Sequence, residues 1–259
     1  MKIPIFVISL VRDSERRKAI SIKMNELGVN FTFIDAIDSK STSNDNLIDS
    51  MRHAGGMGDR MSSGEIACKL SHELVYKKII SSESDWAIIL EDDVLLNRRI
   101  KDLVDGLNDG EFNKLHKENL YLIGGMKGLA SYPIIGKSLF NYISVNGIKL
   151  RRVTYNENKL SRACGYLMHR EMCERFLQFT KANGIYCADD WNHAKENELV
   201  ENFYYSEIAT HPEVSENNSN LESERIEHHG IKRKKRSLTN KILKYIRMRI
   251  KTFIFSLRF

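Results

Sequence analysis

Short apolar segments that alternate with helical segments constrain the fold of this chain more than any other feature. Residues 3–10 are apolar and rich in β-branched side chains, which predicts a buried strand. We expect a helix from Asp13, as its N-cap, to Leu27, with Gly28 as its stop, and a second strand over residues 29–34. A strand, a helix and a strand at this spacing predict a right-handed βαβ unit.

The same alternation continues along the chain. Ser62 and Glu65 form a capping-box pattern before a helix that is expected to reach Ile80. Residues 39–63 are rich in Ser, Asn, Asp and Gly and are expected to form a long loop. Further strands are expected over residues 86–90, 120–123, 164–168 and 203–208, and further helices over 171–181 and 188–198. Residues 126–160 are expected to be irregular, with weak strand signals. The pattern predicts an α/β sandwich with a mostly parallel sheet.

The charge of the chain is unevenly distributed. The net charge is +6, but residues 231–259 hold eleven Lys or Arg residues and no Asp or Glu. The other 230 residues therefore hold 29 basic and 34 acidic side chains, a net charge of −5. An acidic body argues against a protein that binds nucleic acid across its main face, and the basic segment predicts contact with an anionic surface.

Residues 231–259 have the pattern of an amphipathic helix. Most basic side chains fall opposite an apolar face, which holds Leu238, Ile242, Ile246, Ile250, Phe253 and Leu257. Residues 232–236 add five consecutive cations. This predicts a helix that lies in the plane of an anionic membrane surface. The alternatives are a helix packed on the body or on a second subunit, and nucleic-acid binding.

The cysteines and the apolar start of the chain bear on the compartment. Cys68, Cys164, Cys173 and Cys187 have neither zinc-site spacing nor a redox-pair motif, so reduced thiols in a cytoplasmic protein are expected. Only Lys2 precedes the first apolar segment and no small-residue cleavage site follows it, so a buried strand explains it better than a signal peptide.

Three consecutive carboxylates, Glu91, Asp92 and Asp93, follow the apolar strand expected over residues 86–90. In α/β sheets, ligands bind beyond the carboxyl ends of the strands. Three like charges at such a place repel one another unless a cation compensates them, and carboxylate oxygens suit Mg²⁺ or Mn²⁺. The pattern therefore indicates a metal site, with a solvated acidic turn as the alternative.

Basic and imidazole side chains lie near other predicted strand ends. Arg12, Arg16 and Arg17 follow the first strand, where forked hydrogen bonds would suit a pyrophosphate, and Arg12 is the preferred candidate because it is nearest to the strand end. The alternative is a solvated first helical turn. His211, after the last strand, is a candidate third metal ligand, and His72 is either a ligand or a packed helix residue.

Two further carboxylates, Asp189 and Asp190, precede Trp191. One interpretation is an N-cap of the helix that follows. The other is a general base in a pocket, with Trp191 as an aromatic platform for a sugar ring.

Four blocks of the sequence, in order, resemble glycosyltransferase family 25. They are IFVISL at 5–10 with the arginines that follow it, LG at 27–28 with FIDAID at 33–38, GEIACKLSH at 64–72 and AIILEDDV at 87–94. The resemblance covers residues 1 to about 225. This family includes bacterial lipooligosaccharide glycosyltransferases and collagen galactosyltransferases.

The resemblance implies a GT-A fold, a Rossmann-like nucleotide-sugar-binding sandwich, over residues 1–230, with 231–259 as the basic membrane-surface tail. It implies a UDP-sugar donor and Mn²⁺, or Mg²⁺ in its place. Asp93 and Glu91 become the expected metal ligands, joined by His211, and either Asp190 or Asp189 the general base. The expected donor-binding residues are Arg12, Ser9, Asp92, Glu65 and His72. Ser9 and Ala67 depart from the family's usual Asn and Gly, which leaves donor specificity open.

The expected reaction is the inverting, metal-dependent transfer of a hexose to a lipooligosaccharide or LPS acceptor. Galactose from UDP-galactose is favoured because characterised bacterial members of the family are largely galactosyltransferases. Because the acceptor is lipid-linked, the expected location is the bacterial cytoplasm, at the inner face of the inner membrane. The alternatives are an inactive nucleotide-sugar-binding partner, which the intact carboxylates oppose, and a nucleic-acid-binding protein, which the acidic body opposes.

Overall fold

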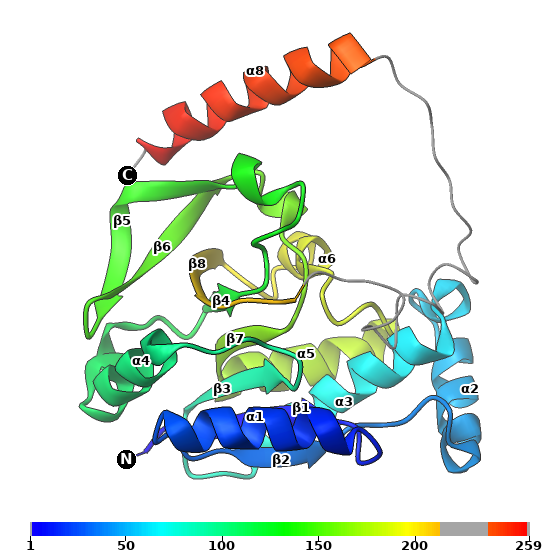
Figure 1. The fold of residues 1–259 in the computed structure, drawn as a ribbon. Helices are drawn as coiled ribbons and strands as arrows, with labels where there is room; N and C mark the ends of the chain where they lie inside the picture. Colours follow the sequence, from blue (N-terminus) through cyan, green and yellow to red (C-terminus); the bar gives the residue numbers. More distant parts are fainter. Residues whose placement is uncertain (1, 213–237, 258–259) are drawn as a thin grey trace.

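A single eight-stranded sheet forms the centre of the computed structural model, which describes residues 2–212 and 238–257 (Figure 1). Its strands are β1 (Ile5–Ser9), β2 (Thr32–Asp35), β3 (Trp86–Glu91), β4 (Asn119–Gly124), β5 (Gly136–Val145), β6 (Ile148–Tyr155), β7 (Gly165–His169) and β8 (Asn202–Ala209). Their order in the sheet is β2-β1-β3-β7-β4-β8-β6-β5. The α/β class predicted from the sequence is confirmed.

The sheet is mixed, because antiparallel strands accompany the parallel ones that the sequence predicts. Strands β2, β1 and β3 are parallel neighbours, and β4 pairs in parallel with β8. Strand β7 runs antiparallel between β3 and β4, and the hairpin β5–β6 extends the far edge in antiparallel fashion. The parallel half of the sheet is therefore the predicted βαβ unit together with β3.

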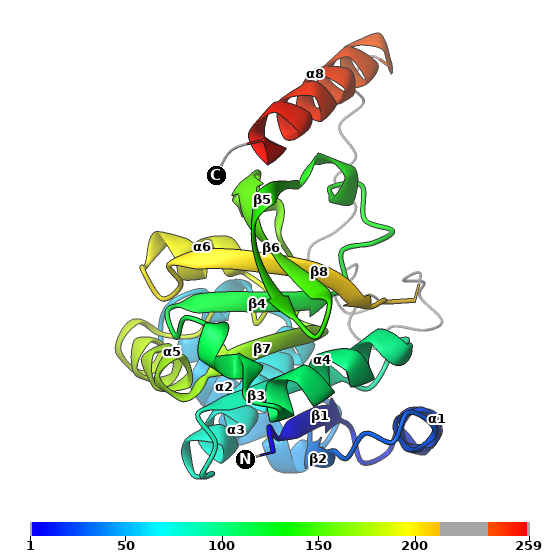
Figure 2. The same ribbon diagram turned by 90° about the vertical axis from the view of Figure 1, so that its left-hand side faces the viewer.

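Helices cover both faces of the sheet (Figure 2). On one face lie α3 (Ser63–Ile80), α5 (Arg170–Asn183) and α6 (Trp191–Glu196), and on the other lie α1 (Ser14–Glu26) and α4 (Arg98–Asn108). The short helix α2 (Asp45–His53) packs beside α3.

The side chains of β1 contribute to two hydrophobic cores, one on each face of the sheet. Phe6 and Ile8 point into the core under α3 and α5, whereas Ile5 and Val7 point into the core under α1 and α4. Because successive side chains of a strand point to opposite faces, a central strand covered on both faces must be apolar throughout. Burial of each such side chain stabilises the fold by roughly 1.5–3 kcal/mol.

Two segments differ from the sequence prediction. Residues 39–63 are not a long loop, because they contain α2, whose Ile48 is 4% exposed and packs against α3. Residues 126–160 contain the hairpin β5–β6 instead of irregular structure. The capping box of Ser62 and Glu65 is confirmed at the start of α3.

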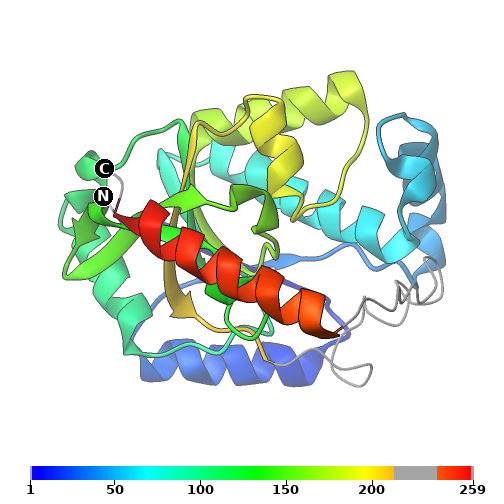
Figure 3. The same cartoon turned by 90° about the horizontal axis from the view of Figure 1, so that it is seen from above.

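Helix α8 (Leu238–Ser256) lies on the hairpin β5–β6, at the opposite end of the molecule from α1 (Figures 1 and 3). The Thr252 hydroxyl donates a hydrogen bond to the Ile134 carbonyl (3.0 Å), and the Thr154 hydroxyl donates one to the Phe255 carbonyl (2.9 Å). The Phe255 ring stacks on Tyr155 with 4.7 Å between centroids.

One face of α8 is thus packed on the body, as one of the alternatives for this segment predicts. Within residues 2–212 and 238–257, no helix combines the length and the apolar character needed to cross a bilayer. The predicted domain boundary between residues 230 and 231 and the basic run at 232–236 lie outside the described residues.

Candidate metal and donor site

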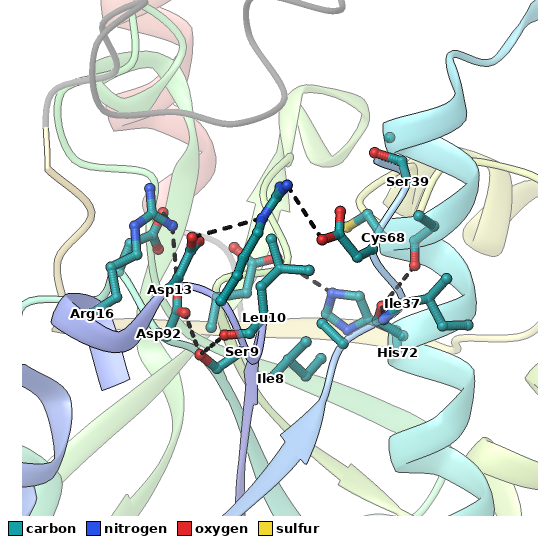
Figure 4. Close-up of a pocket in the computed structure, with 18 residues that line it drawn as sticks. Ile8, Ser9, Leu10, Asp13, Arg16, Ile37, Ser39, Cys68, His72 and Asp92 are labelled. Atoms are coloured by element: carbon teal, nitrogen blue, oxygen red, sulfur yellow. Dashed lines mark hydrogen bonds and ion pairs between the residues drawn. The ribbon is translucent and has the colours of Figure 1, made fainter. Parts of the chain in front are cut away.

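A cavity of about 140 Å³ opens where β1 and β3 end, between the start of α1 and the first half of α3 (Figure 4). Residues of the strand ends and of the loop after β2 line it together with α3. The predicted site residues among them are Ser9, Arg12, His72, Glu91, Asp92 and Asp93. The cavity therefore lies at the sheet edge where the carboxyl ends of parallel strands meet.

The structure brings the three predicted metal ligands together. One carboxylate oxygen each from Glu91 and Asp93 and a ring nitrogen of His211 lie within 4.8 Å of one another. The Nε2 atom of His211 is 3.3 Å from Oδ2 of Asp93. A β-bridge between Leu95 and Thr210 ties the segment after β3 to the end of β8, which fixes His211 beside the carboxylates.

The chemistry of this cluster fits a divalent cation. The second carboxylate oxygen of Asp93, Oδ1, is buried and has no hydrogen-bond partner in the part of the chain that the structure describes. A buried carboxylate oxygen without a donor is costly, and a bound cation would remove that cost. Two carboxylates and an imidazole suit Mn²⁺ or Mg²⁺, so Glu91, Asp93 and His211 would hold such an ion.

The charges of the cluster oppose the effect of burial. Burial alone would raise the pKa of Asp93, but the hydrogen bond and charge of His211, together with Arg16, lower this pKa below its usual value. Burial lowers the pKa of His211, but Asp93 outweighs this effect and raises it overall. The Asp93 carboxylate is therefore ionised at neutral pH, as a metal ligand must be.

Asp92 has a different environment from its neighbours. Its carboxylate accepts hydrogen bonds from the Ser9 hydroxyl (2.6 Å) and from Nη1 of Arg16 (3.2 Å), and that nitrogen also lies 3.7 Å from Asp93. Burial raises the pKa of Asp92, and these hydrogen bonds partly offset the effect. Figure 4 shows Ser9, Asp92 and Arg16 together on one side of the cavity. Asp92 thus holds Ser9 and Arg16 in place.

The preferred arginine of the sequence analysis is placed differently. Arg12 lines the cavity, but its Nη1 atom pairs with Asp38 at 3.2 Å and does not reach the carboxylate motif. Arg16 makes that contact instead. Arg12 lies in the turn before α1, whereas Arg16 lies in the first turn of this helix, beside the end of β3.

Of the two predicted donor-binding residues on α3, the structure brings one to the cavity. His72 lines it, with Nε2 3.3 Å from Oε1 of Glu91. Glu65 is 7% exposed, and its carboxylate accepts a hydrogen bond from the Ser62 backbone N–H (3.0 Å) as part of the capping box. Glu65 does not line the cavity, so a role for it in donor binding stays a prediction.

The two candidate bases lie near the start of α6. The Asp190 carboxylate accepts a hydrogen bond from the His193 N–H (3.0 Å) and caps α6, and Asp189 accepts one from the Arg162 N–H (3.1 Å). Neither lines the cavity. The aromatic platform expected at Trp191 is wrong, because its indole is 1% exposed and packs in the core.

Sequence reasoning missed Arg162. Its φ of +62° is rare for a residue other than glycine, and such backbone conformations cluster at functional sites. The Nη1 atom of Arg162 donates to the Gly125 carbonyl (2.7 Å), and the charge of Arg162 opposes protonation of His211. Arg162 lies between the irregular segment expected at 126–160 and the strand expected at 164–168, where no pattern in the sequence marks it.

Comparison with known proteins identifies the family. The model of "Glycosyltransferase family 25 (LPS biosynthesis protein)" matches residues 2–191. The chain therefore belongs to glycosyltransferase family 25, as the four sequence blocks predict.

Relatives of the chain occur in bacteria and animals. It is 25% identical over 176 residues to the lipooligosaccharide biosynthesis protein lic2B of Haemophilus influenzae, which is 64% of this chain and 59% of lic2B. Another Haemophilus influenzae protein is 25% identical over 265 residues, 96% of this chain and 86% of its own length. Procollagen galactosyltransferase 1-B of Xenopus laevis is 28% identical over 128 residues, 46% of this chain but only 20% of the relative.

Proposed function

We propose that this chain transfers a hexose from a nucleotide sugar to a glycan acceptor in a reaction that depends on a divalent metal ion. The observation that carries the proposal is the convergence of Glu91, Asp93 and His211 at the edge of the cavity, with Oδ1 of Asp93 buried and unpartnered within the described residues. Membership of family 25 supports glycosyl transfer as the chemistry.

The residues around the cavity have complementary roles in this proposal. Mn²⁺ or Mg²⁺ at Glu91, Asp93 and His211 would offset the negative charge of a sugar diphosphate. Arg16 adds a fixed positive charge beside the same carboxylates. Asp190, or Asp189, would accept the proton of the attacking acceptor hydroxyl, and a single displacement of this kind inverts the anomeric carbon.

UDP-galactose is the proposed donor and a lipooligosaccharide or LPS glycan the proposed acceptor. The galactosyltransferase name of the Xenopus laevis relative supports the sugar, and the name of lic2B supports the acceptor class.

A donor and acceptor screen tests this proposal. The full chain is incubated with truncated lipooligosaccharide acceptors, Mn²⁺ and one UDP-sugar at a time, and the products are read by mass spectrometry. We expect the acceptor to gain one hexose from UDP-galactose, with loss of transfer in EDTA and in Asp93→Asn. Asp85→Asn is the matched control, because Asp85 precedes the other end of β3 and its side chain is 65% exposed. Donor binding without transfer to any acceptor would instead support the inactive binding partner.

We also propose that α8 holds the protein on an anionic membrane surface, where a lipid-linked acceptor would lie. Its unpacked face carries apolar side chains that are between 43% and 64% exposed: Ile246, Ile250, Phe253, Ile254 and Leu257. Arg247 and Lys251 are exposed on the same helix. An exposed apolar stripe beside basic residues is typical of an interfacial helix.

Vesicle sedimentation tests the membrane proposal on the full chain. The wild-type protein should sediment with vesicles that contain anionic lipid, and Phe253→Glu should reduce the bound fraction at least about tenfold, because it places a carboxylate in the apolar stripe. Ile22→Glu is the matched control, since Ile22 is 50% exposed on α1, far from α8. Equal binding of the two variants, or no binding of the wild type at low salt, would contradict the proposal.

A further inference from the structure

We propose that Cys68, His72 and Glu91 form a second metal site, suited to Zn²⁺. The thiol sulfur of Cys68, a ring nitrogen of His72 and a carboxylate oxygen of Glu91 lie within 4.8 Å of one another. Cys68 and His72 are four residues apart on α3, so they lie on the same face of that helix. Glu91 reaches them from the end of β3.

The distances fit a tetrahedral ion. Zinc bonds of about 2.0–2.3 Å to N, O and S ligands place neighbouring ligand atoms roughly 3.3–3.8 Å apart. The Nε2 atom of His72 and Oε1 of Glu91 are 3.3 Å apart. Small rotations of the Cys68 and Glu91 side chains would bring the sulfur into the same range.

The imidazole of His72 is already held as zinc ligands usually are. Its Nδ1 atom lies 2.7 Å from the Tyr166 hydroxyl, which in turn lies 3.1 Å from the Tyr76 hydroxyl. These side chains are all buried. A hydrogen bond at one ring nitrogen fixes the orientation of a ligating histidine, and here it aims Nε2 at Glu91.

The two sites differ in the ions that they prefer. A thiolate and an imidazole favour Zn²⁺, whereas the two carboxylates of the site that contains Asp93 favour Mn²⁺ or Mg²⁺. Both sites use Glu91, and Figure 4 shows Cys68 and His72 on α3, across the cavity from Asp92 and Arg16. Zn²⁺ at Cys68 would therefore compete for Glu91 and occupy the donor cavity. This inhibitory consequence rests on the proposed function, but binding of the ion does not.

Cobalt binding tests the site directly. Co²⁺ replaces Zn²⁺ in tetrahedral sites, and a thiolate ligand adds a sulfur-to-cobalt charge-transfer band in the near ultraviolet. Titration of the full chain, with no donor or acceptor present, should produce this band at one equivalent, and Zn²⁺ should abolish it. The measurement is therefore separate from any assay of glycosyl transfer.

Single substitutions assign the ligands. Cys68→Ser should remove the band and weaken Zn²⁺ binding by at least about tenfold, while Asp93→Asn should keep the band. Cys187→Ser is the matched control, because Cys187, like Cys68, is a partly exposed cysteine that forms no disulfide. No band in the wild type, or a band that Cys187→Ser removes and Cys68→Ser keeps, would overturn the proposal.

A second measurement on the wild type avoids dependence on the folding of any variant. Alkylation followed by mass spectrometry compares the modification rates of Cys68 and Cys187 with and without Zn²⁺. Zn²⁺ should protect Cys68 and leave Cys187 unchanged. Equal rates at Cys68 with and without the ion would contradict zinc ligation by this residue.

Discussion

Lys69 is a buried cation whose titration should be visible in the stability of the protein. It is 1% exposed on α3, with Nζ 3.9 Å from the centroid of the Tyr186 ring and 3.7 Å from Oε1 of Glu73. Burial lowers the pKa of Lys69 to about 8, although the charge of Glu73 acts in the opposite direction. The folded state therefore binds this proton more weakly than the unfolded state does.

The magnitude follows from linkage. The fall from 10.5 to about 8 corresponds to roughly 3 kcal/mol. Because the unfolded chain binds more protons at this residue between the two pKa values, the free energy of unfolding rises with pH in that window. From pH 8 to pH 9.5 the Lys69 contribution amounts to roughly 2 kcal/mol.

Urea unfolding of the wild type and of Lys69→Met at several pH values measures this contribution. The window lies above the range in which carboxylates titrate and below that of unperturbed tyrosine. The wild type should gain roughly 2 kcal/mol relative to Lys69→Met between pH 8 and 9.5. Lys23→Met is the control, because Lys23 is a lysine on a helix surface whose side chain is 44% exposed. A constant difference for Lys69→Met would refute the reasoning.

Two further predictions concern the site. Asp190→Asn should lower turnover by about 10²–10⁴ while the melting temperature changes little, because the asparagine oxygen can still accept the His193 N–H hydrogen bond that caps α6. Asp189→Asn should lower turnover less than Asp190→Asn does. If steady-state kinetics show normal turnover in both variants, neither residue is the base. Arg16→Gln should weaken UDP binding, measured by calorimetry, more than Arg12→Gln, because only Arg16 contacts the carboxylate motif. The reverse order would contradict the placement of these arginines.

Much of the fold could be predicted because its signals are local. Continuous apolar strands and the capping box at Ser62 mark the parallel half of the sheet without any tertiary information. The proximity of Glu91, Asp93 and His211 could be predicted for a topological reason. Glu91 ends β3, Asp93 follows it and His211 follows β8, and these strand ends lie at the same edge of the sheet.

The elements that were missed depend on tertiary contacts. Helix α2 is stabilised by Ile48 against α3, and at nine residues it is too short for the helical spacing of Leu47, Ile48 and Met51 to stand out among its polar residues. The helical spacing of Ile66, Leu70 and Leu74 predicts a buried apolar stripe on α3, but only Ile66 and Leu70 are buried. Leu74 is 37% exposed, while Lys69 and Glu73 are buried because they pair with each other inside the core. Binary patterning cannot identify a buried face that is made of paired charges.

Two site residues could not be placed for related reasons. Arg162 owes its position to an unusual backbone conformation, which its sequence neighbours do not signal. In the sequence, Asp190 fits both an N-cap and a general base. In the structure it caps α6, and the indole of Trp191 is buried in the core instead of facing a ligand. The same sequence pattern is therefore compatible with a helix cap and with a catalytic base, and only the three-dimensional structure distinguishes the two roles.

The central claim is that Glu91, Asp93 and His211 hold a metal ion that binds the donor diphosphate. Its most direct test is the affinity for UDP measured by calorimetry with Mn²⁺ and with EDTA, in the wild type, in Asp93→Asn and in the control Asp85→Asn. Mn²⁺ should tighten UDP binding tenfold or more, about 1.4 kcal/mol, in the wild type and in Asp85→Asn, and should have no effect in Asp93→Asn. Equal UDP affinity with Mn²⁺ and with EDTA in the wild type, or an undiminished Mn²⁺ effect in Asp93→Asn, would contradict the claim.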